Sequence, residues 1–553
     1  MSILYSTFPY RKFNACNSVQ QHRTLCNQAF KGFLLLLGIG IRLCFPVDAE
    51  DTANEISFES YLKDLSQTDY ALKDKLTRRI KDEIMTNPAS IEKYSSSSNF
   101  LVKVCFIHAV AELNRLSDYE FLLHFLGDPD AEVVIEAIKA LGTSQNAQFA
   151  KSLRDKCDIT KNEESIVCTA LLALGELENA DSSTFIYSIY TSANSYSIRY
   201  SALTALGKMR TAPAIEKLTA LYPSAPENSK NLILELLGKC RSIPSATDFL
   251  DRLLTTISDT KKQALILCSL GQLESEQHYQ VFIKYLQSDD KTLFHAAIKA
   301  LEYLGDGNAI YPLFKTLSER FEVENQERIY AAIETICALY SLEEIQSYLH
   351  LLDHPSRIIT QLADLGTPSS ETILRELIAH DDPINRIFAI HALTKSASVE
   401  TAQRLLIQRL PKASPIDIAH ILPLFNQWRQ ESLLSYKDLT GIDPASRTEP
   451  FIICNALLSQ SDSFNQLTDI IRNERSPFRW CAVYALIGQN STDEHIRIIT
   501  GFLKDGFLIQ RFYAARTLAL LAKQHTSLKP ILQSFYETET NEKVKTELKN
   551  GIW

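Results

Sequence analysis

The chain has 553 residues, too many for one hydrophobic core, because single cores stop growing at roughly 250 to 300 residues. Apolar residues make up 45% of the sequence and charged residues 22%, which excludes collagen-like and disordered chains. The net charge is −9, and we expect no nucleic-acid partner, because binding DNA or RNA depends on clustered lysine and arginine. Either several domains or one extended array is expected.

The first 49 residues form a candidate export signal. Residues 1–47 contain five basic side chains and no Asp or Glu, and the apolar run FLLLLGIGI follows Lys31. Pro46 ends this apolar region, and small residues stand at Val47 and Ala49, the two positions that a signal peptidase reads. The order predicts a cleaved signal peptide and a mature chain in the periplasm or cell envelope. A cytoplasmic chain is the alternative, because Arg42 interrupts the apolar end and about 30 residues precede it.

The apolar run is also far shorter than the ~20 residues of a membrane-spanning helix. We therefore expect no stable membrane span in the mature chain.

Eight cysteines follow residue 49, and none of them forms a Cys-x-x-Cys pair. They are Cys105, Cys157, Cys168, Cys240, Cys268, Cys337, Cys454 and Cys481. Several sit among alanine and leucine in the same part of successive repeats, where a thiol packs as a small apolar group. The pattern favours free, buried thiols and argues against a zinc site built from cysteine pairs.

The dipeptide Leu-Gly recurs at a nearly fixed interval. Its glycines are Gly142, Gly175, Gly207, Gly238, Gly271, Gly305 and Gly366. The first six are 31 to 34 residues apart. Because glycine adopts the left-handed conformation that ends a helix at no steric cost, each dipeptide predicts a helix end. Polar turns and apolar residues at helical spacing follow, so one period holds two helices.

A second marker, Arg-x-x-Ala, keeps the same phase further along the chain. It occurs at Arg199, Arg328, Arg386, Arg479 and Arg511. The interval of 93 residues between Ala389 and Ala482 fits three periods. Since one helix pair cannot bury its apolar face alone, the pairs must stack. The sequence therefore predicts an all-α fold, a right-handed α-solenoid (α-α superhelix) of about 13 helix pairs.

These segments resemble HEAT repeats, in particular the short bacterial variety also called phycobilisome-lyase-like HEAT repeats. The resemblance rests on DPDAEVVIEAIKALG from Asp128, SIRYSALTALG from Ser197, LGDGNAIYPL from Leu304 and DPINRIFAIHAL from Asp382. It covers residues 100–525 and implies about 13 HEAT-like helix pairs.

In that family, an Asp of the turn and an Arg of the second helix often form a hydrogen-bond ladder along the stack. The resemblance implies this structural ladder role for Asp382, Arg386, Asp505, Arg511, Arg199, Arg328 and Arg479. The ladder is expected to be incomplete, because Val134, Val167 and Phe294 occupy the arginine position in other repeats.

The expected domain organisation has five parts. They are an N-terminal basic segment with the signal peptide (1–49), a helical cap and linker (50–99), the repeat array (100–410), an irregular proline-rich break (411–450), and C-terminal repeats with a cap (451–553).

No catalytic signature occurs in the sequence. It lacks Gly-x-Ser-x-Gly, a Walker loop and His-Glu-x-x-His. His108 and Glu112 are spaced for one helix face, but they supply only two of the three or four ligands that a metal needs. Some HEAT-repeat enzymes bind a di-iron centre through paired His-Glu dipeptides, and this sequence has no such dipeptide. We expect no enzyme activity, no metal and no cofactor.

Stacked helix pairs present one helix of each pair along an extended surface. We therefore expect a non-catalytic scaffold that binds one or more proteins. The first 49 residues carry a charge of +4, so residues 50–553 carry −13, which favours a basic or extended partner segment. A phycobilin-lyase-like enzyme and a cytosolic adaptor are the alternatives. A HEAT-like DNA glycosylase is disfavoured, because it needs a basic groove.

Overall fold

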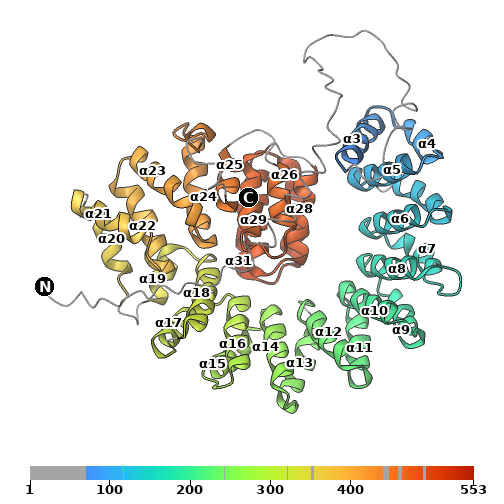
Figure 1. Cartoon of the computed structure of the whole chain (residues 1–553), viewed down its shortest axis with the longest axis horizontal. Coiled ribbons are helices and arrows are strands. Elements are labelled where there is room, and N and C mark those ends of the chain that lie inside the picture. Colours follow the sequence, from blue (N-terminus) through green and yellow to red (C-terminus); the bar gives the residue numbers. More distant parts are fainter. Residues whose placement is uncertain are drawn as a thin grey trace, which may run out of the picture. The chain divides into compact units, whose positions relative to one another are not determined.

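A computed structural model describes residues 70–115, 117–241, 243–320, 322–349, 354–365, 367–439, 448–458, 464–489 and 493–553 (Figure 1). In these ranges every regular element is a helix. The predicted signal peptide at 1–49 lies outside the described residues, as do residues 50–69 of the predicted cap and linker.

Helix pairs follow one another along the chain. Before them come α3 (Tyr70–Thr86), α4 (Ser90–Ser95) and α5 (Phe100–Leu113). The first helices of the pairs are η1 (Asp118–Gly127), α7 (Ala150–Lys156), α9 (Ser182–Ser192), α11 (Ala212–Leu221), α13 (Pro244–Thr256), α15 (Tyr279–Leu286), α17 (Ile310–Glu319), α19 (Leu342–Tyr348), α21 (Pro368–Leu377), α23 (Val399–Arg409), η7 (Tyr436–Leu439), α26 (Phe464–Arg472), α28 (Asp493–Asp505) and α30 (Lys529–Thr538).

The second helices are α6 (Ala131–Thr143), α8 (Glu164–Glu176), α10 (Tyr196–Met209), α12 (Glu227–Gly238), α14 (Thr260–Gln272), α16 (Lys291–Leu304), α18 (Val323–Cys337), α20 (Ser356–Leu365), α22 (Pro383–Ser396), α24 (Pro415–Gln430), α25 (Glu449–Leu458), α27 (Arg479–Ala485), α29 (Leu508–Ala522) and α31 (Glu542–Ile552). Short 3-10 turns lie at η2 (Ala147–Phe149), η3 (Tyr222–Ser224), η4 (Glu276–His278), η5 (Gly307–Ala309), η6 (Leu410–Lys412), η9 (Leu486–Gly488) and η10 (Thr526–Leu528).

This order confirms the all-α solenoid of about 13 helix pairs. Thirteen second helices run from α6 to α29, and α24 and α25 fill the 93-residue interval that the three-period fit predicts. Second helices of neighbouring pairs contact each other from α6 to α18 and again from α20 to α31. Figure 1 shows the even-numbered second helices α6 to α16 along one edge of the array and the odd-numbered first helices α7 to α15 along the other.

Short polar side chains start many of the second helices. Asp130, Asp259, Asp290 and Asp382 each accept hydrogen bonds from backbone N–H groups of the following turn. These N–H groups have no partner inside the helix, so an aspartate at the cap satisfies them and favours helix formation there. The polar turns seen in the sequence therefore place the start of these four second helices.

The Leu-Gly glycines allow close packing, and the predicted role as left-handed helix ends is wrong for most of them. Of the described glycines, only Gly305 has a positive φ, at 68°. A Cβ at Gly271 would lie 2.6 Å from Ala300 Cα, and one at Gly175 would lie 2.7 Å from Ala205 O. The second helices thus approach each other too closely for a side chain at these positions. Gly366 lies outside the described residues.

Residues three positions after several of these glycines take the left-handed conformation instead. They are Gln145, Glu178, Arg210 and Glu274, with φ between 45° and 56°. The helix therefore continues past the glycine by less than one turn and ends on a polar side chain.

The stretch 411–450, expected to be irregular, contains the 16-residue helix α24 with Pro423 inside it. Residues 440–447 lie outside the described ranges. The stacking changes earlier, because α18 packs against α22 and α24. Among the described residues, no helix combines the length and apolarity that crossing a bilayer requires.

Candidate functional site

Four charged residues occupy the same turn in four successive helix pairs. Glu178, Arg210, Arg241 and Glu274 each stand three positions after a Leu-Gly glycine, at intervals of 31 to 33 residues. Because the pairs stack, equivalent turns lie next to each other along the array. We call these four residues the charged row.

Two arginines of the charged row hold the end of α28. Arg210 Nη1 donates to Lys504 O at 3.0 Å. Arg241 donates from Nη1 to Gly506 O at 2.9 Å and from Nη2 to Lys504 O at 3.2 Å. Carbonyls at a helix C-terminus lack intrahelical partners and carry the negative end of the helix dipole, so guanidinium groups stabilise them. The sequence separation across these contacts exceeds 260 residues.

The two glutamates of the charged row form ion pairs with the same segment. Glu178 Oε1 lies 2.9 Å from Lys504 Nζ. Glu274 accepts two hydrogen bonds from Arg511, at 2.7 and 2.9 Å, and Glu539 accepts two more, at 2.9 and 3.1 Å. Arg511 is only 1% exposed. Burial acts to lower the pKa of its guanidinium, but the two carboxylates raise this pKa above its ordinary value.

Apolar contacts accompany this polar strip. The rings of Tyr303 and Phe507 lie 4.8 Å apart, and Tyr513 donates its hydroxyl to Ala338 O at 3.1 Å. A Cβ at Gly305 would lie 2.6 Å from Leu508 Cδ2, so this glycine lets Leu508 approach.

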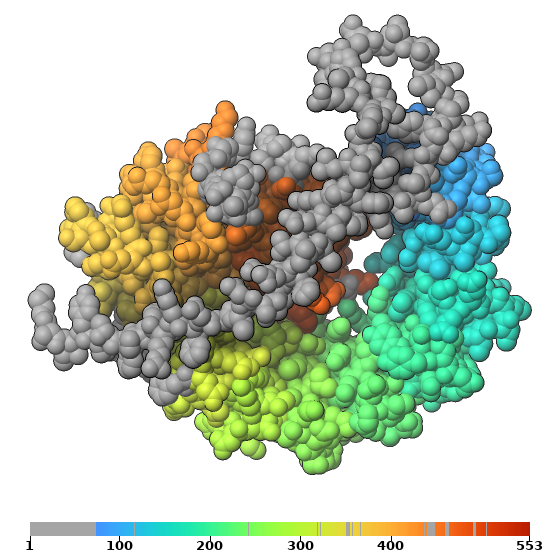
Figure 2. All heavy atoms as spheres, in the orientation of Figure 1, coloured from blue at the N-terminus to red at the C-terminus, as the bar shows by residue number. Residues whose placement is uncertain are grey.

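Further polar contacts extend the same surface. Arg497 donates to Glu112 O at 2.5 Å, and Lys543 Nζ lies 3.3 Å from Glu344 Oε1. Apart from Glu344, the residues of the array that make these contacts with the C-terminal helices lie at or just past the C-terminal ends of second helices and of α5. We call this surface the seam. Figure 2 shows atoms of the last helices, in red, meeting those of the middle repeats.

Away from the seam, two tyrosines of α10 face solvent. Tyr196 is 61% exposed and Tyr200 is 46% exposed, and their ring centroids are 6.2 Å apart. Both belong to the N-terminal half of the helix, whereas the seam involves residues beyond its C-terminal end. This leaves an aromatic surface that the C-terminal helices do not cover.

Polar pairs also join neighbouring helices of the array. Lys208 Nζ lies 2.6 Å from Glu176 Oε1, and Lys291 Nζ lies 2.7 Å from Glu324 Oε2. His108, considered as a metal ligand from the sequence, contacts Glu136 at 3.0 Å. This hydrogen bond and the nearby Lys139 lower the pKa of Glu136 to about 2. Glu176 and Lys208 each stand directly after a Leu-Gly glycine, so the repeat phase could have indicated their pairing.

The predicted ladder residues have different partners in each repeat. Asp382 caps α22 through Ile384 N at 2.8 Å and also contacts His354 at 3.1 Å. Arg386 pairs with Asp417 at 2.9 Å and with Glu334 at 2.7 Å, joining α22 to α24 and α18. The Asp382 and Arg386 side chains therefore serve separate contacts.

The other arginines of the predicted ladder are dispersed. Arg199 donates to Asn194 O at 3.3 Å, Arg328 pairs with Glu324 at 3.4 Å, and Arg479 donates to Ile471 O at 2.7 Å. Arg511 lies in the seam, while the side chain of Asp505 lies outside the described residues. Among the six whose side chains the structure describes, only Arg511 forms an ion pair with a residue more than 200 positions away.

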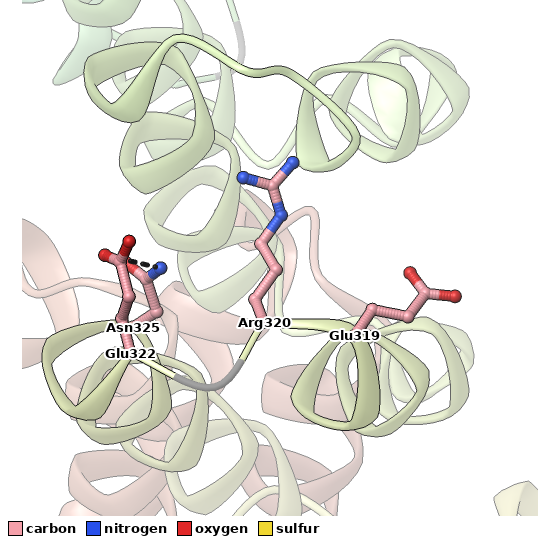
Figure 3. Close-up of a pocket in the computed structure, with 4 residues that line it drawn as sticks. All are labelled: Glu319, Arg320, Glu322 and Asn325. Carbon is pink, nitrogen blue, oxygen red and sulfur yellow. Dashed lines mark hydrogen bonds between the residues drawn. The ribbon is translucent and has the colours of Figure 1, made fainter.

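A hollow of about 480 Å³ lies beside the turn between α17 and α18 (Figure 3). Its lining side chains already contact protein groups. Arg320 donates to Ser288 O at 2.8 Å and covers the ring of Phe294, while Asn325 donates to Glu322 at 3.3 Å. Figure 3 shows Glu319 pointing away from the other three labelled residues. We assign this hollow no ligand.

The remaining ionisable groups of the described part form no cluster of three or more metal-binding side chains. The eight cysteines are free thiols, and six of them are buried.

Two buried histidines form a hydrogen-bonded pair between α22 and α24. His391 Nε2 lies 2.9 Å from His420 Nδ1. Burial, together with Lys395, lowers the pKa of His391 to about 4, so both rings are neutral near pH 7.

Comparisons with known proteins agree with the repeat. Residues 198–222, in α10 and α11, match the family described as PBS lyase HEAT-like repeat. Among solved structures, the complex of CpcE and CpcF of phycocyanin lyase from Nostoc sp. PCC7120 is 18% identical, over 39% of this chain and 94% of that one, with a TM-score of 0.25. Importin beta is 12% identical, over 89% of this chain and 85% of that one, with a TM-score of 0.32.

Human deoxyhypusine hydroxylase is 15% identical, over 47% of this chain and 97% of that one, with a TM-score of 0.22. A comparison with curated proteins gives no match. The resemblance to HEAT repeats is confirmed, while likenesses at these identities transfer no function to this chain.

Proposed function

We propose that the chain is a non-catalytic, protein-binding scaffold that is exported to the periplasm or cell envelope. The observation that supports binding is the exposed aromatic pair Tyr196 and Tyr200 on a second helix, outside the seam. Aromatic side chains are enriched among the residues that dominate binding energy at protein interfaces. Stacked second helices place such side chains on a rigid surface.

The partner that we propose carries a basic or extended segment. Residues 50–553 have a net charge of −13, which attracts cationic segments and speeds their association. Lysine and arginine also bind tyrosine faces through cation–π contacts.

Affinity capture with a double variant tests this function. The Tyr196→Ser, Tyr200→Ser variant should lose a partner that the unchanged chain captures from a cell-envelope extract. A matched control is Val323→Ser, because Val323 is 69% exposed on α18. Equal recovery of every captured protein by all three chains would contradict the assignment of the binding surface.

Export needs a separate measurement. Mass spectrometry of the purified cellular protein should give a mature N-terminus at Glu50, after the small residues Val47 and Ala49. An N-terminus at Met1 would contradict export and would favour a cytosolic adaptor.

A further inference from the structure

The seam has two ends that differ in chemistry. At one end, charged side chains join α28 to α5 and to the turns after α8, α10 and α12. We call this the polar end, and its residues are Arg497 and Lys504 of α28 with Glu112, Glu178, Arg210 and Arg241 of the array. It therefore contains three of the four members of the charged row.

The other end of the seam is held by packing against α16, α18 and α19. The ring of Phe507 lies on Tyr303, Leu508 lies against Gly305, and the hydroxyl of buried Tyr513 donates to the array. We call this the packed end, and its residues are Tyr303, Gly305, Ala338 and Glu344 of the array with Phe507, Leu508, Tyr513 and Lys543. The buried pair of Arg511 and Glu274 lies between the two ends.

Salt acts on the two ends differently. The side chains of Lys504 and Glu178 are 31% and 37% exposed, so dissolved ions screen their attraction. The pair of Arg511 and Glu274 is buried and is screened much less. Apolar packing of the kind that Phe507 and Leu508 make does not depend on charge. Salt should therefore weaken the polar end selectively.

Closing the polar end also removes a cation from water. Burial, together with the charges of Arg511 and Arg210, lowers the pKa of Arg241 to about 10. The closed seam thus disfavours this charge, and opening returns it to water. The helices that would move form one body, because α28 packs along α29, and α29 and α30 pack against α31 (Figure 1).

We propose that the polar end is a reversible autoinhibitory contact: helices α28–α31 pivot about the packed end and uncover Arg210 and Arg241. In the closed seam these guanidinium groups bind carbonyls at the end of α28, which covers them against a partner. The partner that fits them is the C-terminal end of another helix, since it presents the same free carbonyls. The proposal does not depend on the protein-binding surface at Tyr196 and Tyr200.

Zero-length cross-linking of the full chain with a water-soluble carbodiimide tests the pivot, because this reagent joins a lysine to a carboxylate at ion-pair distance. The Lys504–Glu178 product reports the polar end, and the Lys543–Glu344 product reports the packed end. The matched control is Lys208–Glu176 inside the array, a pair at 2.6 Å whose side chains are 42% and 35% exposed. Peptide mass spectrometry measures each product.

Raising potassium chloride from about 0.1 M to about 1 M shortens the Debye length from about 10 Å to about 3 Å. We expect the Lys504–Glu178 product to fall roughly fivefold relative to the control, while Lys543–Glu344 changes in step with the control. A decline of all three products in parallel would overturn the proposal, because salt would then weaken exposed ion pairs in general. Loss of both seam products together, or absence of both at low salt, would also overturn it.

Arginine labelling measures whether the array is uncovered. Phenylglyoxal should modify Arg241 roughly fivefold faster at the higher salt concentration, in step with loss of the polar end. Arg252, which is exposed on α13, is the control and should react at the same rate at both concentrations. Unchanged labelling of Arg241 would contradict the autoinhibitory role.

Discussion

Arg511 of α29 and Glu274, which follows α14, are 237 positions apart in the sequence and meet through two parallel hydrogen bonds of 2.7 and 2.9 Å. Bidentate ion pairs of this kind fix the orientation of the guanidinium and the carboxylate as well as the distance between them. The guanidinium also binds Glu539, so it joins α29, the α30–α31 turn and the array at one point. This group is therefore the main polar anchor of the seam.

Replacing Arg511 with methionine should destabilise the chain strongly. Methionine fills much of the volume but leaves Glu274 and Glu539 buried without their cation, and breaking a buried pair in this way costs about 3–5 kcal/mol. Urea unfolding followed by circular dichroism measures the change. Arg252→Met is the matched control at an exposed helical arginine, where a change within about 0.5 kcal/mol is expected. Equal effects of the two substitutions would contradict the anchoring role.

Replacing Arg241 with methionine should loosen the seam while the rest of the fold stays intact. The variant loses two charged hydrogen bonds to carbonyls at the end of α28. A loss of about 1–2 kcal/mol in local stability makes amide exchange in residues 500–512 roughly 5- to 30-fold faster. Exchange in α6 and α8 should not change. Uniform acceleration along the whole chain would indicate global destabilisation instead.

The packing role of the Leu-Gly glycines predicts opposite effects for two Gly→Ala substitutions. Gly271→Ala forces a Cβ to within 2.6 Å of Ala300 Cα and should destabilise by about 1–3 kcal/mol, as overpacking does. Gly501 lies in helix α28 with nothing within 4 Å of an added Cβ, so Gly501→Ala should stabilise by about 0.5–1 kcal/mol. Thermal midpoints of both variants check the difference in sign. Destabilisation of similar size at both positions would contradict the packing argument.

The period of about 31 residues predicted the fold because each repeat contacts mainly its neighbours. Local signals such as Asp130 and Asp382 at helix starts recur in phase, so the sequence alone placed the helix pairs. The Leu-Gly glycines do lie near the ends of second helices, as predicted. Most of them are required by close packing against the next helix and not by a positive φ. A glycine required by a neighbouring helix and a glycine required by a positive φ look the same in a sequence, and only the distances to Ala300 or Ala205 separate them.

The seam was beyond prediction from the sequence. Once the repeat phase is known, Glu178, Arg210, Arg241 and Glu274 can be recognised as equivalent turn residues. Their partners in α28 and α29 follow from how far the array curves, which depends on small rotations at every stacked pair. The predicted role of Arg511 came from its repeat position, whereas its ion pair with Glu274 depends on this long-range contact.

The buried pair His391 and His420 predicts a loss of stability in mild acid. Burial lowers the pKa of His391 to about 4 and that of His420 well below its ordinary value, while both titrate near ~6.5 in the unfolded chain. Between about pH 6.5 and 4 the unfolded state therefore binds more protons than the folded state. The stability of the fold is complete above pH 6.5 and decreases as the pH is lowered towards 4. His391 alone accounts for a loss on the order of 3 kcal/mol in the free energy of unfolding across this pH window.

Unfolding midpoints between pH 8 and 4 measure this effect. The double variant His391→Asn, His420→Asn keeps a hydrogen-bonding pair without a titrating ring, so its midpoint should fall less steeply below pH 6.5. His525→Asn removes an imidazole at an exposed position and serves as the control. Parallel pH profiles for the unchanged chain and the double variant would contradict the role of the pair.

Thiol labelling gives the last prediction and reports on burial and processing together. Burial raises the pKa of Cys157 to about 12 and that of Cys240 to about 11, so neither forms much thiolate at pH 8. In the native chain an aromatic disulfide reagent should react first at Cys168, because Cys268, which is also partly exposed, has a pKa that burial raises to about 11. Cys168→Ser should therefore remove this fast phase. In urea the count should rise to eight for a chain cleaved before Glu50, and to eleven for an uncleaved chain. Rapid native labelling of most thiols would contradict the packed array.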